Sequence, residues 1–414
     1  MLHYQRSTLI ISVVLSMICF STPVFSRTVI QNIPSTTISE EYSDNYFTSE
    51  NNKQEEFITT VAFGFSVGFL NKKSKIYLEY TPEFKKYQNL NNRDGFEHNV
   101  NLDGEFRLSK FTQLNAGFNY TTEDATLVGG SWDNSVYLSG TSQLTKNTLF
   151  SFSETYSQSF DEQQRTGRYL EHNVNKTSAS ISNQFGKRDR AGLNFSYEFD
   201  DYKNSDADEY TKYSPSAFIT YWFTPLNGVD SNVAYESTDF DNSPDDSIDD
   251  IDTYSGHIRY LRKFSEHFDG YLKYRHTFSE RDSGDHTIHH PSVGFDWQIT
   301  DDSGISIGVG LLFSEWDNEN SNSTDPFVDL DAYKIFNFSR RGSLAVTGSS
   351  GYDEAGEDEP SLGYTIYYRA GFQLNYKLQK RLTSYLNGSY QTDEFKEETV
   401  DRRDTTLEFG AGLS

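Results

Sequence analysis

The feature that most constrains this chain is an alternation of apolar with small or polar residues, repeated in one short stretch after another. It is plainest in residues 191–200, where five apolar residues alternate with five of the other kind: Ala191, Leu193, Phe195, Tyr197 and Phe199 against Gly192, Asn194, Ser196, Glu198 and Asp200. A period of two over such a length indicates a β-strand with one apolar and one polar face. Repeated with no helical segment between the copies, the pattern predicts a closed antiparallel sheet that is apolar outside and polar inside, which is typical of an outer-membrane β-barrel.

The same pattern sets the expected strands. They lie at 33–47, 57–70, 75–87, 96–108, 111–122, 132–144, 148–160, 170–185, 190–203, 209–223, 227–240, 251–264, 267–280, 286–299, 304–317, 327–340, 342–355, 361–378, 381–394 and 399–413. Short connections alternate with longer ones, as in up-and-down bacterial barrels with short periplasmic turns and longer extracellular loops. The hairpin 57–87 has its short turn in the middle, so a strand must rise before it, and 33–47 can be that strand. The prediction is an all-β transmembrane barrel of about 20 strands (18–20) with both termini periplasmic.

Two strands carry long apolar faces that we expect to contact lipid. One face comprises Ile305, Ile307, Val309, Leu311 and Phe313; the other comprises Tyr364, Ile366, Tyr368, Ala370, Phe372, Leu374, Tyr376 and Leu378. Lys334 breaks a third face of this kind, which predicts a β-bulge or a position at the membrane interface.

The N-terminus has the features of a secretory signal peptide. Arg6 precedes an apolar run from Leu9 to Phe20, which is too short to span a membrane, and Val24 and Ser26 fit the small-residue cleavage rule. Residues 1–26 are therefore expected to be removed near Ser26/Arg27, leaving 27–414 as a single barrel domain. The sole cysteine, Cys19, lies in the segment removed, so the mature chain would have neither disulfides nor cysteine-ligated metals.

The formal net charge of −25 argues against nucleic acid as a partner. Much of the acid lies in expected loops, above all in residues 239–252. Such a loop could bind divalent cations that bridge lipopolysaccharide, or it could be a solvated surface loop. Its spacing lacks the glycine and terminal glutamate of a calcium-binding loop.

No catalytic motif stands out, so the chain is not expected to be an enzyme or to carry a cofactor. His286, His289 and His290 could ligate a metal, but no acidic residues with ligand spacing lie nearby, and polar strand-end residues explain them better. The sequence has no His-Glu-x-x-His motif, and its two Gly-x-Ser-x-Gly matches, at 64–68 and 304–308, lie inside expected strands rather than at the strand-to-helix turn of a nucleophile elbow. A site assembled from separate strands would leave no local motif.

The polar face of the strands holds the residues that we expect to matter for function. Charged candidates for lining the lumen are Asp103, Glu105, Arg107, Glu198, Asp200, Arg259, Lys273, Arg275, Asp296, Arg369 and Lys377. Rings of charge at a constriction set ion and solute selectivity. The alternative is that they hydrate the wall and pair with one another. Inward tyrosines that could stack on sugar rings are Tyr77, Tyr271, Tyr367 and Tyr385.

Two N-terminal segments resemble the opening of the putative β-barrel porin 2 family. They are Pro34-Ser-Thr-Thr-Ile-Ser-Glu-Glu-Tyr-Ser-Asp-Asn-Tyr-Phe47 and Glu56-Phe-Ile-Thr-Thr60. The tracts Leu78-Glu-Tyr-Thr-Pro-Glu-Phe84 and Asp404-Thr-Thr-Leu-Glu-Phe-Gly-Ala-Gly-Leu-Ser414 are similar to the family as well, although such barrels generally end on an aromatic residue. The resemblance implies an outer-membrane barrel found with surface-polysaccharide export systems, in some cases partnered by a periplasmic polysaccharide export protein. It implies no catalytic residues.

Together these features predict a wide, unplugged outer-membrane channel that conducts exopolysaccharide or capsular polysaccharide passively. The expected surroundings are outer-membrane lipid, lipopolysaccharide and the barrel assembly machinery. A general diffusion porin for small hydrophilic solutes shares every feature named so far. A structural or adhesive surface barrel without transport is the third possibility, and it predicts a filled lumen.

Overall fold

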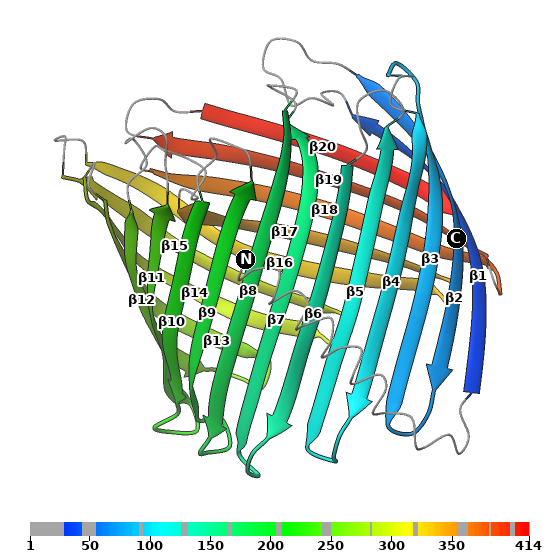
Figure 1. Ribbon diagram of the computed structural model, residues 1–414. Coiled ribbons are helices and arrows are strands. Elements are labelled where there is room, and N and C mark those ends of the chain that lie inside the picture. The colour runs from blue at the N-terminus through cyan, green and yellow to red at the C-terminus, as the bar shows by residue number, and fades with distance from the viewer. Residues whose placement is uncertain are drawn as a thin grey trace.

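The computed structural model describes residues 29–43, 55–90, 94–125, 131–163, 168–203, 209–241, 250–281, 284–317, 322–354, 363–380, 382–397 and 402–413. These residues form one sheet of 20 strands (Figure 1). The strands are β1 (Val29–Ser43), β2 (Glu56–Leu70), β3 (Ser74–Tyr87), β4 (Gly95–Arg107), β5 (Thr112–Ala125), β6 (Ser131–Gln143), β7 (Thr148–Gln163), β8 (Arg168–Gln184), β9 (Arg190–Lys203), β10 (Glu209–Tyr221), β11 (Asn227–Asp241), β12 (Ile251–Lys263), β13 (Phe268–Glu280), β14 (His286–Thr300), β15 (Ser303–Trp316), β16 (Ser323–Ser339), β17 (Gly342–Glu354), β18 (Gly363–Gln379), β19 (Leu382–Glu397) and β20 (Arg402–Leu413).

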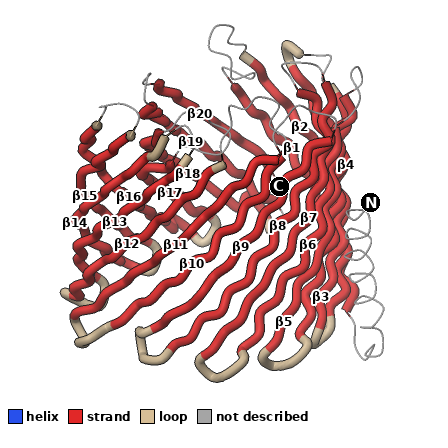
Figure 2. Tube along the Cα trace, turned by 60° about the vertical axis from the view of Figure 1, so that its left-hand side comes forward, coloured by secondary structure: helices blue, strands red, loops and turns tan. Residues whose placement is uncertain are grey.

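Each strand pairs antiparallel with the next along the chain, and β1 closes the ring on β20 over Ile38–Tyr42 and Phe409–Leu413. The short turns gather at one end of the barrel, which we call the short-turn end (Figure 2). The predicted all-β, up-and-down barrel of about 20 strands is thus confirmed. The first strand, expected at 33–47, occupies Val29–Ser43, and its existence follows the turn-length argument. The expected signal peptide and residues 242–249 of the acidic loop lie outside the described residues.

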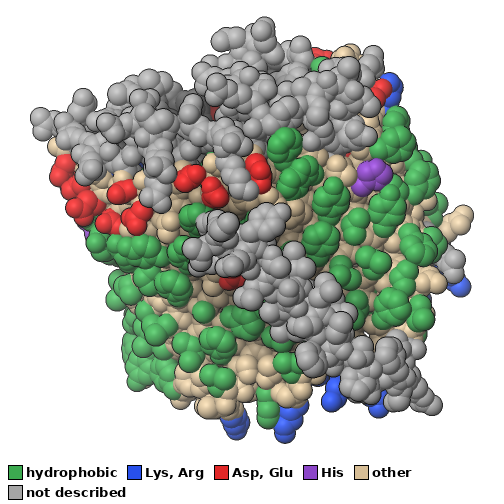
Figure 3. Space-filling view, in the orientation of Figure 1, with side chains coloured by type: hydrophobic (Ala, Val, Ile, Leu, Met, Phe, Trp, Pro, Cys, Tyr) green, Lys and Arg blue, Asp and Glu red, His purple; other side chains and the backbone are tan. Residues whose placement is uncertain are grey.

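The outer face of the barrel is apolar. On β2, Phe57, Phe63, Phe65 and Phe69 are exposed, whereas Ile58 and Ala62 on the other face are buried. Hydrophobic side chains cover the middle of the wall, Lys and Arg edge the short-turn end, and Asp and Glu gather near the opposite rim (Figure 3). A band of this kind matches a bilayer with polar layers on both sides. None of the described residues belongs to a helix long and apolar enough to cross a membrane.

A polar patch interrupts this band on β7 and β8. Glu154 alternates with Phe150 and Phe152 on the outer face, and its carboxylate accepts hydrogen bonds from Asn175, at 2.7 Å, and Thr177. Nearer the loop end, the Tyr156 hydroxyl donates to Asn173 at 3.0 Å. The donors on β8 therefore compensate for a carboxylate placed where the neighbouring strands carry apolar residues.

The ladder between β16 and β17 ends at Leu330–Ser350, although both strands continue. At that point the Ser350 hydroxyl donates to the carbonyl of Val328 at 2.6 Å. Beyond it, Tyr352 on β17 packs edge-on against Phe327 on β16 and His290 on β14, with ring centroids 5.4 Å apart in both cases. The ends of β17 and β18 therefore lean over the inner face of β14–β16.

This packing corrects part of one predicted lipid face. Tyr364 and Ile366 are 1% and 4% exposed and belong to a buried apolar cluster with Ile288, Leu312 and Tyr352, among others. Farther down β18, Tyr368, Tyr376 and Leu378 are exposed, as predicted. The alternation is unbroken along β18. What changes is the surface that its apolar face meets: lipid near the short-turn end, and the inner side of β14–β16 near the loop end.

Lys334 illustrates the interface position that the sequence suggested. It lies on the outer face of β16, near the short-turn end, with its Nζ 5.6 Å from the centroid of the Phe336 ring. The register between β16 and β17 shifts between Phe336 and Ser339, so the predicted irregularity is present just beyond it. A long cationic side chain in this place can keep its charge in the polar layer.

Candidate functional site

The registers place all eleven predicted lumen residues on one continuous face of the sheet. Paired residues point to the same side, so the face can be followed from strand to strand, for example from Asp103 through Gly117 to Tyr137. Followed around the ring, it carries Glu198 and Asp200 on β9, Arg259 on β12, Lys273 and Arg275 on β13, Asp296 on β14, and Arg369 and Lys377 on β18. It lies opposite the exposed apolar face, so we call it the inner face.

Four of the eleven come together on β12–β14. The Arg259 guanidinium lies 3.3 Å from the Asp296 carboxylate and 5.2 Å from the centroid of the Tyr271 ring. Lys273 reaches Asp329 on β16 at 3.6 Å, across β14 and the glycine-rich β15. Arg275 lies over the Tyr352 ring, 4.9 Å from its centroid. Of these charges, Arg275 is the one that contacts the inward-leaning end of β17.

Glu198 and Asp200 form a second group on β8–β10. Lys176 pairs with Glu198 at 2.6 Å, and His172 pairs with Asp200 at 2.5 Å. A cavity of about 330 Å³ opens here, lined by Ser153, Thr155, Lys176, Thr177, Ser178, Ser196, Tyr197, Glu198, Lys212 and Ser214. Hydroxyl groups dominate the lining, and some bond to each other across strands, as Ser153 and Ser178 do at 2.7 Å.

The remaining candidates are spread along β4 and β18. Glu105 pairs with Lys75 at 2.6 Å, and Asp103 accepts a hydrogen bond from the Tyr137 hydroxyl. Arg369 lies over the Tyr367 ring at 4.2 Å. Arg107 and Lys377 lie near the short-turn end, at or near the ends of their strands. The eleven residues do not form one ring, because they lie at different heights: Arg107 and Lys377 are near the short-turn end, and Asp200 is near the loop end of β9. Only Arg259 and Asp296 pair directly with each other.

The inner tyrosines lie flat across glycines of neighbouring strands. The ring of Tyr77 covers Gly68, where an added Cβ would stand 2.9 Å from it. Tyr137, Tyr271, Tyr367 and Tyr385 cover Gly117, Gly294, Gly351 and Gly412 in the same way. Of the four proposed for sugar stacking, Tyr271 and Tyr367 lie beneath arginines, and Tyr271 is buried. Tyr77 and Tyr385 remain half-buried on the wall.

This contact makes a stability prediction. Gly117→Ala places a methyl group against the Tyr137 ring, which must then leave Asp103, and we expect a loss of about 1–3 kcal/mol in the free energy of unfolding. Gly348→Ala is the matched control, because nothing lies within 4 Å of the added methyl group. Urea unfolding in detergent micelles measures both. Equal losses for the two variants would show that the tyrosine does not depend on its glycine.

The three clustered histidines do not converge on a common point. His286 and His290 belong to the inner face, whereas His289 lies on the outer face, 2.7 Å from the Tyr274 hydroxyl. His286 bonds to the Ser314 hydroxyl at 2.7 Å and stacks on Trp316. No group of three or more metal-ligating side chains occurs among the described residues. The arrangement gives no support to the metal-site interpretation.

Several inner-face residues were not singled out from the sequence. Lys176, Lys212, Glu236, Asp329 and Asp331 all lie on that face, and most of them form its ion pairs. Their strands alternate less cleanly, because β8 and β16 carry polar residues on both faces. The cross-strand register would have identified Lys176 and Lys212, since both lie opposite Glu198, which was already assigned to the inner face.

Outside the strands, Asp94 precedes β4 and offers a test at low pH. Hydrogen bonds from Lys86 and from the backbone N–H of Tyr87, the latter at 2.8 Å, hold the pKa of Asp94 below its ordinary value of 3.8. A lowered pKa means that the interaction stabilises the fold above pH 3.8 and is lost as the pH falls through the lowered pKa. We expect Lys86→Met to raise the pKa of Asp94 and Lys85→Met, on the opposite face, to leave it unchanged. Carboxyl NMR titration distinguishes the two, and an unshifted Asp94 in Lys86→Met would contradict the assignment.

A family model matches residues 32–192, from β1 to the first residues of β9. That family is Putative beta-barrel porin 2. The match confirms the resemblance predicted from the opening strands, and it covers the wall that holds Asp103, Glu105 and Lys176. No curated protein sequence matches this chain.

Solved structures that are similar in fold include siderophore receptors. The siderophore receptor PirA from Pseudomonas aeruginosa has a TM-score of 0.54 at 9% identity, covering 94% of this chain and 80% of that chain. The ferric enterobactin receptor mutant R480A from the same organism has a TM-score of 0.52 at 6% identity, covering 92% of this chain and 81% of that chain. The siderophore receptor PirA from Acinetobacter baumannii has a TM-score of 0.52 at 7% identity, covering 93% of this chain and 80% of that chain. At such identities the likeness concerns the fold alone.

Fold and family together describe a porin-like, integral outer-membrane β-barrel. Porin and receptor barrels are not enzymes. The inner face of this barrel presents ion pairs, hydroxyl groups and tyrosines. What such a wall can do is hydrate, orient and select what passes along it.

Proposed function

We propose that this chain is a passive conduit for a hydrophilic polymer, and that the polymer is an exported exopolysaccharide or capsular polysaccharide. The observation that carries the proposal is that charged side chains of the inner face remain open to solvent inside the ring. The side chain of Lys176 is 59% exposed and that of Asp329 is 42% exposed. Charges at these positions need water, and a wall that keeps them hydrated leaves room for a hydrated solute.

The chemistry of β7–β10 supports a saccharide in particular. Most residues that line the cavity there are serines and threonines, and a hydroxyl group both donates and accepts hydrogen bonds as sugar hydroxyls do. Weak, repeated contacts of this kind let a polymer slide without being held. The half-buried rings of Tyr77 and Tyr385 add flat apolar surfaces that suit the faces of sugar rings.

The cellular setting belongs to the same proposal. Residues 1–26 direct export and are removed near Ser26/Arg27, the assembly machinery inserts residues 27–414, and lipopolysaccharide surrounds the outer rim. A periplasmic polysaccharide export protein meets the short-turn end and delivers the polymer. The likeness to siderophore receptors concerns the fold and does not bear on the substrate.

Two experiments test the conduit and its cargo. In planar bilayers, Ser178→Trp, which fills the hydroxyl-lined cavity, should lower the single-channel conductance. Ile181→Trp, on the lipid-facing side of the same strand, should not. Deletion of the gene should reduce surface polysaccharide.

The other outcomes identify the alternatives. Conductance with unchanged surface polysaccharide would indicate a general diffusion porin. A barrel that conducts nothing would indicate a structural or adhesive role.

A further inference from the structure

We infer that the conduit is built for a polymer without net negative charge, which excludes polyanionic polysaccharides. The inference rests on the proposed function and specifies its substrate. Its basis is the balance of charge on the inner face. Among the described side chains, that face carries twenty acidic and twelve basic residues, a net charge of −8.

Half of the basic residues of the inner face are paired with acids. Six of them pair with acids within 4 Å: Lys75, Lys85, Lys176, Lys212, Arg259 and Lys273. Arg275 and Arg369 lie over tyrosine rings. Each ion pair cancels one charge of each sign, so the excess of negative charge on the inner face remains after pairing.

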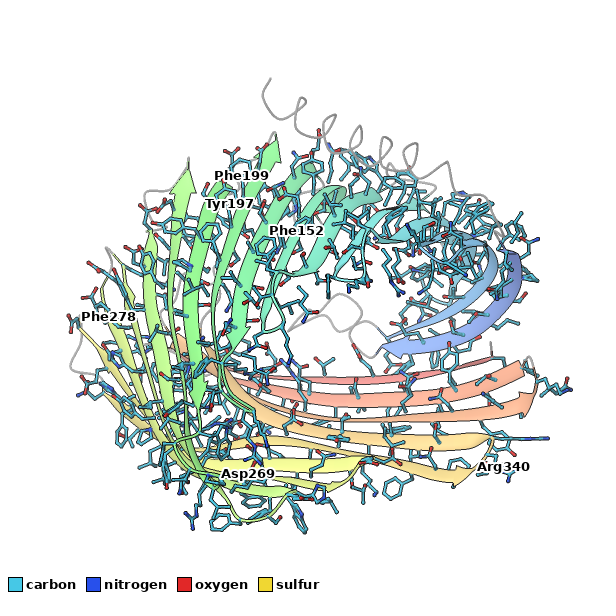
Figure 4. The ribbon with its side chains drawn as sticks, turned by 90° about the horizontal axis from the view of Figure 1, so that it is seen from below. Phe152, Tyr197, Phe199, Asp269, Phe278 and Arg340 are labelled. Carbon is cyan, nitrogen blue, oxygen red and sulfur yellow. The ribbon has the colours of Figure 1, made fainter. Side chains whose placement is uncertain are left out.

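Several acids of the same face have no such partner. Glu79, Glu83 and Asp331 form no ion pair with any described residue. Near the short-turn end, Asp269 lies directly opposite Asp296, and the two line a cavity of about 230 Å³ that Asp331 also borders. Seen from below, Asp269 lies across the ring from Tyr197 and Phe199 of β9, a strand that contributes to the hydroxyl-lined cavity (Figure 4).

A wall of this sign repels anions from the lumen. Repulsion acts over about one Debye length, which is about 10 Å at 0.1 M salt. A polyanion would meet it at every repeat unit, whereas an uncharged or amine-bearing glycan would not. The hydroxyl-lined cavity offers such a glycan hydrogen bonds, and the excess of acids on the inner face excludes a competitor of the wrong charge.

The test measures ion selectivity of the full chain in planar bilayers under a KCl gradient. We expect the sign of the reversal potential to show a preference for cations. Its magnitude should be larger at low salt than at 1 M. The triple variant Glu79→Gln, Glu83→Gln and Asp331→Asn should move the potential toward zero. The matched control, Asp239→Asn, Glu280→Gln and Glu315→Gln, changes three exposed acids of the outer face and should leave it unmoved.

Polymer block provides the second readout. Dextran and chitosan oligosaccharides added to the short-turn side should reduce the potassium current, and dextran sulfate should not. Anion preference, or stronger block by dextran sulfate than by dextran, would overturn the inference while leaving a conduit in place. A barrel without any conductance would overturn the proposed function and this inference together.

Discussion

Leu312→Ala is expected to lower the free energy of unfolding by about 2–5 kcal/mol, the range for a buried leucine whose surroundings cannot collapse. The side chain is 0% exposed and packs where the ends of β17 and β18 lean over the inner face. Two sheet layers meet there, each held by its own hydrogen bonds, so neither can move in to fill the space. Urea unfolding in lipid vesicles measures the loss.

Leu311→Ala is the matched control, one residue away on the other face of β15. Leu311 is 41% exposed on the lipid side. Lipid tails fill the space that a shorter side chain leaves, so this variant loses transfer energy but forms no cavity. Its destabilisation should be clearly smaller. Equal losses would mean that the interior cluster is not packed as the structure shows.

The pair also shows what the sequence can and cannot predict. The alternation in Ser303–Trp316 assigns Leu311 and Leu312 to opposite faces, and both assignments hold. This alternation does not indicate that Leu312 packs against residues of other strands rather than facing water. That contact depends on where β17 leaves β16, at Leu330–Ser350, which is a tertiary event without a local sequence signal.

The barrel itself was predictable because each strand carries its own periodicity and each turn its own length. For the charged candidates, the sequence predicts the face of the sheet on which each lies but not the residue with which it pairs. Glu198 shows why: its partner Lys176 lies on β8, where Asn173, Asn175 and Thr177 make the outer face polar and hide the period. Glu154 is the opposite case, since its place among Phe150 and Phe152 marks an outward carboxylate in the sequence alone.

Tyr364→Phe is expected to lower the free energy of unfolding by about 1.5–3 kcal/mol, because the lost hydrogen bond has a carboxylate as its acceptor. The Tyr364 hydroxyl donates to Asp325 and lies 3.1 Å from the hydroxyl of Ser323, so it joins β18 to β16 across β17. The hydroxyl is thus a polar link between the inward-leaning end and the wall behind it. Tyr376→Phe, lower on the same face of β18 and 36% exposed, should cost little.

The consequence for transport follows from position. If this bond helps to hold the ends of β17 and β18 inward, its loss lets them move, and Tyr364→Phe should raise the single-channel conductance or add larger conductance levels. Asp325→Asn should have a similar effect, and the double variant should be less than additive because the two residues share one interaction. If the stability losses of Tyr364→Phe and Asp325→Asn add up in the double variant and the conductance is unchanged, the two residues do not share one interaction. They would leave the inward lean to the apolar cluster around Leu312 alone.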